Sequence, residues 1–332
     1  MLIFIHILVS FLVPSLFFQT IRKIAIKYNL IDIPGGRKKH KGNIPLIGGI
    51  YIFMGINVFL ILSLNYLDPN IFLIVISTWI VFLSGLIDDL KQSTWHLRVS
   101  AQIFGSLFIV LFSGVQIQTI GNFPFFGSLD LGFLSIPFTI LCVVALSNSI
   151  NLMDGHDGLA STITIFPFLF ALYSVRNNPE IYGFIILLII LLLSFKFLNL
   201  RKINKIFLGD SGSLSLGFLL SWILIYFSDS NLKIMSDETI PWLIALPIFD
   251  VLRVIQSRIK EKKLITSAGN DHIHHMIRNR YGKDNTLKII TLIVLSLSFL
   301  GLLFGLLIPE LSYVLYIITF LSFIKATKIL SN

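Results

Sequence analysis

Residues 289–308 read IITLIVLSLSFLGLLFGLLI and contain no charged side chain. Two more runs, Ile71–Ile87 and Ile181–Phe195, also lack charged residues. A helix of about 20 apolar residues can cross the hydrocarbon core of a bilayer. Helices are the default structure in lipid, because each backbone N–H and C=O must find a partner within the segment. These runs therefore predict an all-α integral membrane protein.

The composition extends this prediction to the whole chain. Of the 332 residues, 55% are hydrophobic and only 13% are charged, whereas soluble domains carry about 25% charged residues. Cys142, the single cysteine, lies in an apolar segment, which excludes an internal disulfide. We expect one polytopic domain over residues 1–332, with about eleven transmembrane helices. They lie near residues 2–24, 46–64, 71–87, 99–115, 131–150, 159–175, 181–196, 212–228, 240–255, 287–308 and 311–326.

The positions of lysine and arginine predict the orientation of these helices. All of the 26 basic residues except Arg176 and Lys233 fall on one set of alternate loops, on the C-terminal tail or at the basic end of the first segment. Cytoplasmic loops carry such an excess, so we expect the N-terminus outside and the C-terminus in the cytosol. The first segment is expected to be retained, because its basic residues follow the apolar run. The net charge of +9 comes mostly from these basic loops, so it does not indicate binding to nucleic acid.

The inward loops also hold most of the chemically active side chains. We expect them to form an active-site face together; they are residues 27–45, 88–98, 151–158, 197–211 and 256–286. The outward loops are short and plain by comparison. Several acidic residues among basic loops favour a site for a divalent cation.

Asp88 and Asp89 end the third expected span. Carboxylates are costly at a membrane boundary, and a helix C-terminus disfavours negative charge. The pair is therefore expected to bind a cation or accept a proton, with a polar helix end as the alternative.

The most specific motif runs from Asn148 to Asp157, where oxygen-bearing side chains recur every three residues. They are Asn148, Asn151, Asp154 and Asp157. The spacing does not fit an EF-hand, which needs a closing glutamate. A plain polar turn would not need four such residues, so the motif favours a ligand site.

The stretch Phe207–Ser213 reads FLGDSGS and opens the eighth span. Ser211 or Ser213 could cap that helix, and a diphosphate could lie against its free N–H groups. Asp210 would then hold Mg²⁺ against the same phosphates. An ordinary helix cap explains this motif equally well.

A basic segment and a histidine cluster complete the set. Arg37–Lys41 precedes Gly48–Gly49, so it could be a phosphate-binding arm or a membrane anchor, and the glycines indicate a close helix approach. The cluster at His272, His274 and His275 lacks a zinc-type spacing. It is better suited to hydrogen bonds with phosphate oxygens, with a solvated loop as the alternative.

Taken in order, these motifs resemble the polyprenyl-phosphate N-acetylhexosamine-1-phosphate transferases over about residues 30–280. The resemblance implies transfer of a sugar-1-phosphate from a UDP-N-acetylhexosamine to a polyprenyl phosphate with release of UMP. It implies Mg²⁺ as cofactor, with Mn²⁺ as a substitute, in a bacterial inner membrane enzyme that faces the cytosol and contacts membrane lipids. A homodimer is an open expectation. Because Ile273 interrupts the histidines, the chain resembles the GlcNAc branch more than the phospho-MurNAc-pentapeptide branch.

The resemblance also implies residue roles. It gives Mg²⁺ to Asp210 and Asn151, and the acceptor phosphate to Asp88 and Asp89. The remaining expected catalytic or substrate-binding residues are Lys38, Lys39, His40, Asn148, Asp154, Asp157, Phe207, His272, His274 and His275. A one-step displacement is expected, with an aspartyl-phosphate route as the alternative. A transporter or flippase is the competing class, but such proteins usually place charges at mid-bilayer in repeated halves.

Overall fold

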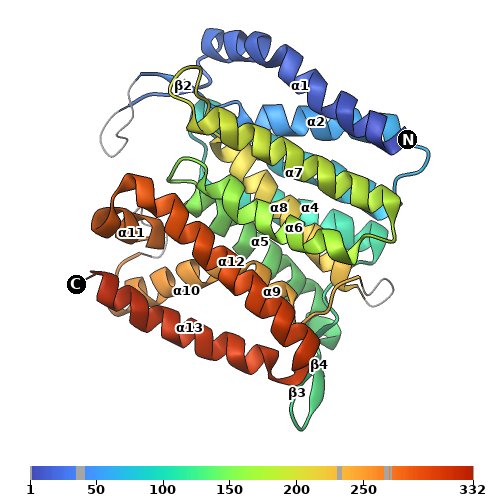
Figure 1. The fold of residues 1–332 in the computed structure, drawn as a ribbon, viewed down its shortest axis with the longest axis vertical. Coiled ribbons are helices and arrows are strands. Elements are labelled where there is room, and N and C mark those ends of the chain that lie inside the picture. The colour runs from blue at the N-terminus through green and yellow to red at the C-terminus, as the bar shows by residue number, and fades with distance from the viewer. Residues whose placement is uncertain (1, 35–41, 230–233, 265–268, 270, 332) are drawn as a thin grey trace.

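The computed structural model describes residues 2–34, 42–229, 234–264, 269 and 271–331. Figure 1 shows a bundle of helices lying side by side, with the N- and C-terminal ends on opposite sides of the view. Eight of the described helices are long and apolar enough to cross a membrane. The prediction of an all-α membrane protein is thus confirmed at this level. The number of eleven crossings and the orientation stay predictions.

Each of the eleven expected segments is helical. The long helices are α1 (Leu2–Lys27), α3 (Pro69–Lys91), α4 (Trp95–Ser113), α5 (Ser135–Met153), α7 (Pro179–Leu200), α8 (Gly209–Ser228), α12 (Lys283–Leu307) and α13 (Pro309–Ser331). The shorter helices are α2 (Gly48–Ser63), α6 (Leu159–Ser174), α9 (Ile240–Leu243), α10 (Ala245–Lys260) and α11 (Ile273–Tyr281). The strands form two antiparallel pairs, β1 (Ile31–Asp32) with β2 (Ile44–Pro45) and β3 (Thr119–Phe123) with β4 (Gly127–Asp130), and a 3₁₀ turn, η1, covers Gly132–Leu134.

The segment 240–255 is the place where the structure differs from the expected single helix. It is divided at Ile244 into α9 and α10. Pro247 lies in the first turn of α10, where a missing backbone N–H costs no helical hydrogen bond. A helix that continued from α9 would lose a bond at this proline. After this break, α10 begins at Ala245 and carries Asp250 and Arg253.

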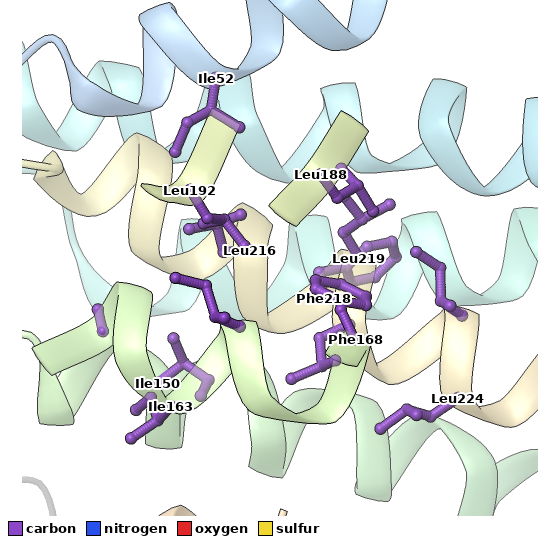
Figure 2. Packing of buried hydrophobic residues seen from close by; sticks show 14 of the residues in the cluster. Ile52, Ile150, Ile163, Phe168, Leu188, Leu192, Leu216, Phe218, Leu219 and Leu224 are labelled. Carbon is purple, nitrogen blue, oxygen red and sulfur yellow. The ribbon is translucent and has the colours of Figure 1, made fainter. Parts of the chain in front are cut away.

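Helix α8 is the centre of the bundle. Of its most apolar 18-residue window, 94% is buried, against 6% for α13 at the periphery. It packs mainly on α3 and α5, and also on α2 and α6. Figure 2 shows side chains of α8 meeting those of neighbouring helices: Leu216, Phe218, Leu219 and Leu224 lie among Ile52, Ile150, Ile163, Phe168, Leu188 and Leu192.

Glycines allow very close packing at the beginning of α8. A Cβ atom at Gly85 would lie 2.6 Å from the backbone nitrogen of Ser211, and one at Gly49 would lie 2.6 Å from that of Gly212. The backbone N–H of Gly48 also donates to the carbonyl of Phe207 at 2.8 Å. The predicted close approach at Gly48–Gly49 is confirmed, and it fixes the position from which Asp210 projects.

Candidate active site

Two carboxylates from distant parts of the chain meet at one arginine. Asp88 lies in the last turn of α3 and Asp210 in the first turn of α8. Nη1 of Arg98, from the first turn of α4, lies 3.0 Å from Oδ2 of Asp88 and 2.5 Å from Oδ2 of Asp210. Asp88 and Asp210 thus share one cluster, as the sequence predicts, but the cation between them was not anticipated.

Asp89 points to the backbone of α8 and not to this arginine. Its Oδ1 accepts from the N–H of Asp210 at 2.7 Å, and its Oδ2 accepts from the N–H and hydroxyl of Ser211 at 3.0 and 2.7 Å. Asp89 therefore caps α8 from another helix, where negative charge is favourable. The prediction that Ser211 or Ser213 caps α8 is wrong. Two of the N–H groups expected to receive a diphosphate are already occupied by Asp89.

Asn151 joins the cluster, whereas Asn148 does not contact it. The side-chain nitrogen of Asn151 donates to Oδ1 of Asp210 at 3.0 Å and to the hydroxyl of Ser213 at 2.8 Å. The side-chain nitrogen of Asn148 donates instead to Oε1 of Gln102 on α4 at 2.8 Å. Because the two ends of an amide are assigned from such contacts, Asn151 can also present its oxygen to a cation beside Asp210.

Asp154 and Asp157 lie in the turn between α5 and α6, in different charge environments. Burial and the nearby carboxylates of Asp210 and Asp157 raise the pKa of Asp154 well above its usual value. Asp157 pairs with Lys205 at 2.7 Å and with Lys283 at 3.1 Å. Although burial alone would raise it, these lysines hold the pKa of Asp157 below its usual value. Asp154 therefore adds to an acidic cluster, while Asp157 is neutralised locally.

The histidine cluster is held by a buried aspartate of α10. Asp250 is fully buried, and its Oδ2 lies 2.7 Å from Nδ1 of His272. Its Oδ1 accepts from the backbone N–H of Ile273 at 2.9 Å and from Arg253 at 2.8 Å. A carboxylate partner at Nδ1 places a proton there and fixes the ring orientation. Asp250 was not among the predicted site residues, although an ionisable residue in an apolar helix is a signal of function.

The other two histidines lie beside the turn that carries Asp154. His274 is 1% exposed, and neither of its ring nitrogens has a hydrogen-bond partner among the residues that the structure describes. A Cβ atom at Gly155 would lie 2.5 Å from Nε2 of His274. Burial, with a smaller effect of His275, lowers the pKa of His274 to about 3. His274 is therefore neutral near pH 7. His275 is half-buried, and burial likewise lowers its pKa.

Phe207 and the basic arm complete the predicted residues. The backbone of Phe207 joins the beginning of α2 to that of α8 through bonds with Pro45 and Gly48, and the Lys205 ammonium lies 5.0 Å from the Phe207 ring centroid. Lys38, Lys39 and His40 lie outside the described residues. Arg98, Lys205, Lys283 and Asp250 are the site residues that the sequence analysis missed. Arg98 had a signal, since it follows Asp88 by ten residues in the same inward loop.

The residues at Asp88 and Asp210 fit a magnesium ion. In the described part of the chain no three His, Cys, Asp or Glu side chains group as metal ligands. Mg²⁺ does not require that, since it is commonly held by one or two carboxylates together with waters and substrate phosphates. Arg98 shows that one positive centre can reach both carboxylates. The donor set therefore suits a cation completed by substrate.

Comparisons with known proteins identify relatives of this chain. The family described as glycosyl transferase family 4 matches residues 71–228, which include Asp88, Asn151 and Asp210. The undecaprenyl-phosphate alpha-N-acetylglucosaminyl 1-phosphate transferase of Escherichia coli O157:H7 is 29% identical over 94% of this chain and 87% of its own length. A relative in Bacillus subtilis (strain 168), named as a probable undecaprenyl-phosphate N-acetylglucosaminyl 1-phosphate transferase, is 27% identical over 90% of this chain and 83% of its own.

The helical fold, the acidic cluster and these matches define a membrane-embedded transferase. Over residues 71–228 the chain is similar to glycosyl transferase family 4. The resemblance seen in the motifs is thereby confirmed.

Proposed function

We propose that this enzyme transfers N-acetylhexosamine 1-phosphate from a UDP-sugar to undecaprenyl phosphate and releases UMP. GlcNAc 1-phosphate is the first choice, because the relatives are named for N-acetylglucosaminyl 1-phosphate transfer to undecaprenyl phosphate. The reaction would begin the synthesis of a cell-surface polysaccharide at the cytosolic face of the bacterial inner membrane. The main support is the meeting of Asp88 and Asp210 at a single positive centre.

The chemistry needs positioning and charge neutralisation more than a strong base. An oxygen of the acceptor phosphate attacks the β-phosphorus of the UDP-sugar, the bond from that phosphorus to the bridging oxygen breaks, and UMP leaves. A phosphate monoester has a second pKa of about 6, so the attacking oxygen is already ionised at neutral pH. Asp88 and Asp210 would hold a Mg²⁺ ion, which would supply positive charge to the diphosphate and the leaving group.

Individual residues would then divide the work. Asp88 and Asp210, with Asn151, would hold the cation. Asp89 would keep the beginning of α8 in place and so fix the direction of Asp210, which favours a positioning role over the catalytic one predicted for it. Lys205 and Lys283 lie where they could reach donor phosphates when Asp157 releases them. His272, His274 and His275 would hydrogen-bond the phosphate oxygens of the donor, as the sequence predicts.

A UMP-release assay on the purified full-length protein tests this proposal. Undecaprenyl phosphate is supplied with a panel of UDP-sugars, including UDP-GlcNAc and UDP-MurNAc-pentapeptide, with Mg²⁺ or with EDTA. We expect Mg²⁺-dependent UMP release with UDP-GlcNAc. Release with the pentapeptide substrate alone would assign the other branch, and no release with any substrate would refute the proposal.

The same preparation separates the two chemical routes. Radiolabelled UDP-GlcNAc is incubated with the enzyme without acceptor, and the protein is examined for covalent label. We expect no label, because a one-step displacement forms no enzyme intermediate. A labelled aspartate would establish the two-step route instead.

A further inference from the structure

Arg98 occupies the position that a divalent cation would need. Its Nη1 contacts Oδ2 of Asp88 at 3.0 Å and Oδ2 of Asp210 at 2.5 Å. If Asp88 and Asp210 held a divalent cation, the cation and the guanidinium would compete for the same carboxylate oxygens. A guanidinium and a divalent cation cannot share this space, and their charges repel.

The two carboxylates also interact with each other, and their remaining side-chain contacts are to uncharged groups. Oδ1 of Asp88 accepts from the hydroxyl of Ser93 at 2.7 Å. Oδ1 of Asp210 accepts from the side-chain nitrogen of Asn151 at 3.0 Å. Within the described part of the chain, the ion pairs of Asp88 and Asp210 are both made by Arg98. Arg98 therefore supplies the positive charge that keeps two facing carboxylates together.

This arrangement can be exchanged, because it is open to solvent. The side chains of Arg98, Asp88 and Asp210 are 24%, 14% and 32% exposed. An arginine stays charged at any physiological pH, so it cannot make room for a metal by losing a proton. It can do so only by moving away on its flexible stem.

We propose that Arg98 is an exchangeable counter-ion of this site. In the substrate-free enzyme it bridges Asp88 and Asp210, and a divalent cation displaces it from both. The freed guanidinium can then pair with a phosphate oxygen, for which its planar donors are well suited. The inference rests on the proposed function only in this last step. The competition between arginine and metal is independent of the substrate.

The alternative is that Arg98 has a permanent structural role. It would then link α3, α4 and α8 whether or not the metal is bound. The two possibilities predict opposite effects when the arginine is removed. If Arg98 holds the carboxylates in position, its removal would weaken cation binding. If Arg98 competes with the cation, its removal would strengthen cation binding.

Metal titration without substrate distinguishes them. Mn²⁺ binding is followed by electron paramagnetic resonance on full-length protein in detergent, for the wild type, Arg98→Gln and Arg98→Met. Arg176→Gln is the matched control, because it also removes one positive charge but from an exposed arginine that donates to the carbonyl of Tyr173 in an expected outward loop. We expect both Arg98 variants to bind Mn²⁺ about tenfold more tightly and the control to change less than about twofold. Unchanged or weaker binding in the Arg98 variants would overturn the proposal.

A measurement on the wild type avoids any effect of substitution on folding. Phenylglyoxal modifies accessible arginines, and mass spectrometry reports the modification of each. We expect Mg²⁺ to increase the modification of Arg98. Arg258, which is held by Asp271 through bonds of 3.0 and 3.1 Å, should not change. Protection of Arg98 by Mg²⁺, or no change, would contradict the exchange.

These results can be read separately from the UMP-release assay. Wild-type protein that binds Mn²⁺ and releases UMP, together with unchanged Mn²⁺ binding in the Arg98 variants, would remove this inference and leave the proposed function. Tighter binding in the variants without UMP release from the wild type would do the reverse. A wild type that binds no Mn²⁺ would refute the exchange and the metal assignment together.

Discussion

The carboxylates of α3 and α8 differ from the carboxylate of α10 in their exposure and in their charge partners. Asp88 and Asp210 are partly exposed and share one arginine. Asp250 is fully buried and pairs with Arg253, His272 and a backbone N–H. A buried charge must keep its partners, since losing one leaves the other uncompensated. An exposed pair contributes little to stability and can change partners. The surroundings of Asp88 and Asp210, the exchangeable region, are therefore suited to a change of partner. The surroundings of Asp250, the fixed region, are suited to keeping His272 in one position.

The largest expected effect is on folding stability and comes from removing the buried charge of Asp250. Asp250→Asn leaves Arg253 buried without its charge partner and weakens the contact to His272. We expect a loss of about 3 kcal/mol of folding stability, measured as a lower Tm in detergent. Asp88→Asn is the matched control and should cost less than about 1 kcal/mol, because its carboxylate is partly exposed. Equal losses in the two variants would remove the distinction between the regions.

The next effect concerns chemistry in the exchangeable region. Asp210→Asn removes a charge that we assign to the cation. We expect UMP release to fall by at least about 100-fold, as when a group that stabilises the transition state is removed, with little change in Tm. Activity close to that of the wild type would show that Asp210 is not required for the metal.

The pH dependence of stability tests the fixed region. Burial keeps the pKa of His274 at about 3 in the folded protein, whereas an unfolded histidine titrates near 6.5. Below about pH 6.5 the His274 imidazole binds a proton in the unfolded chain but stays neutral in the folded chain. The folding stability therefore falls as the pH decreases. Between about pH 7.5 and about pH 5 this amounts to about 2 kcal/mol. Compared with wild type, His274→Gln should lose less Tm over this range, and an equal loss would exclude His274 as the cause.

The smallest expected effect is on Tm, and it distinguishes the role of Asp89 from that of Asp88. Asp89→Asn and Ser211→Ala remove opposite ends of one hydrogen-bonded contact. Their effects on Tm should therefore be coupled by about 1 kcal/mol in a double-mutant cycle. Asp88→Asn with Ser211→Ala should be additive. Additivity in both cycles would show that the contact of Asp89 with the Ser211 hydroxyl does not contribute to holding α8.

The sequence predicted the parts of the fold and site that depend on local pattern. Apolar runs placed the helices, and the glycines at Gly48–Gly49 indicated a close approach that the structure confirms. The Asp-Asp motif placed Asp88 in the site but could not tell it from Asp89, because the two differ only in the helix that each faces. The pairing of Asp250 with His272 joins residues 22 positions apart. It depends on the break before α10, which no apolar pattern revealed.

The central position of α8 has a consequence for biogenesis. A helix with so little lipid-facing surface is poorly suited to wait alone in the bilayer, and its serines would then face acyl chains. The helices α3 and α5, on which it mainly packs, precede it in the chain, as do α2 and α6. When the ribosome delivers α8 to the membrane, its neighbours are already there to receive it. The helices made afterwards can then close around a finished centre.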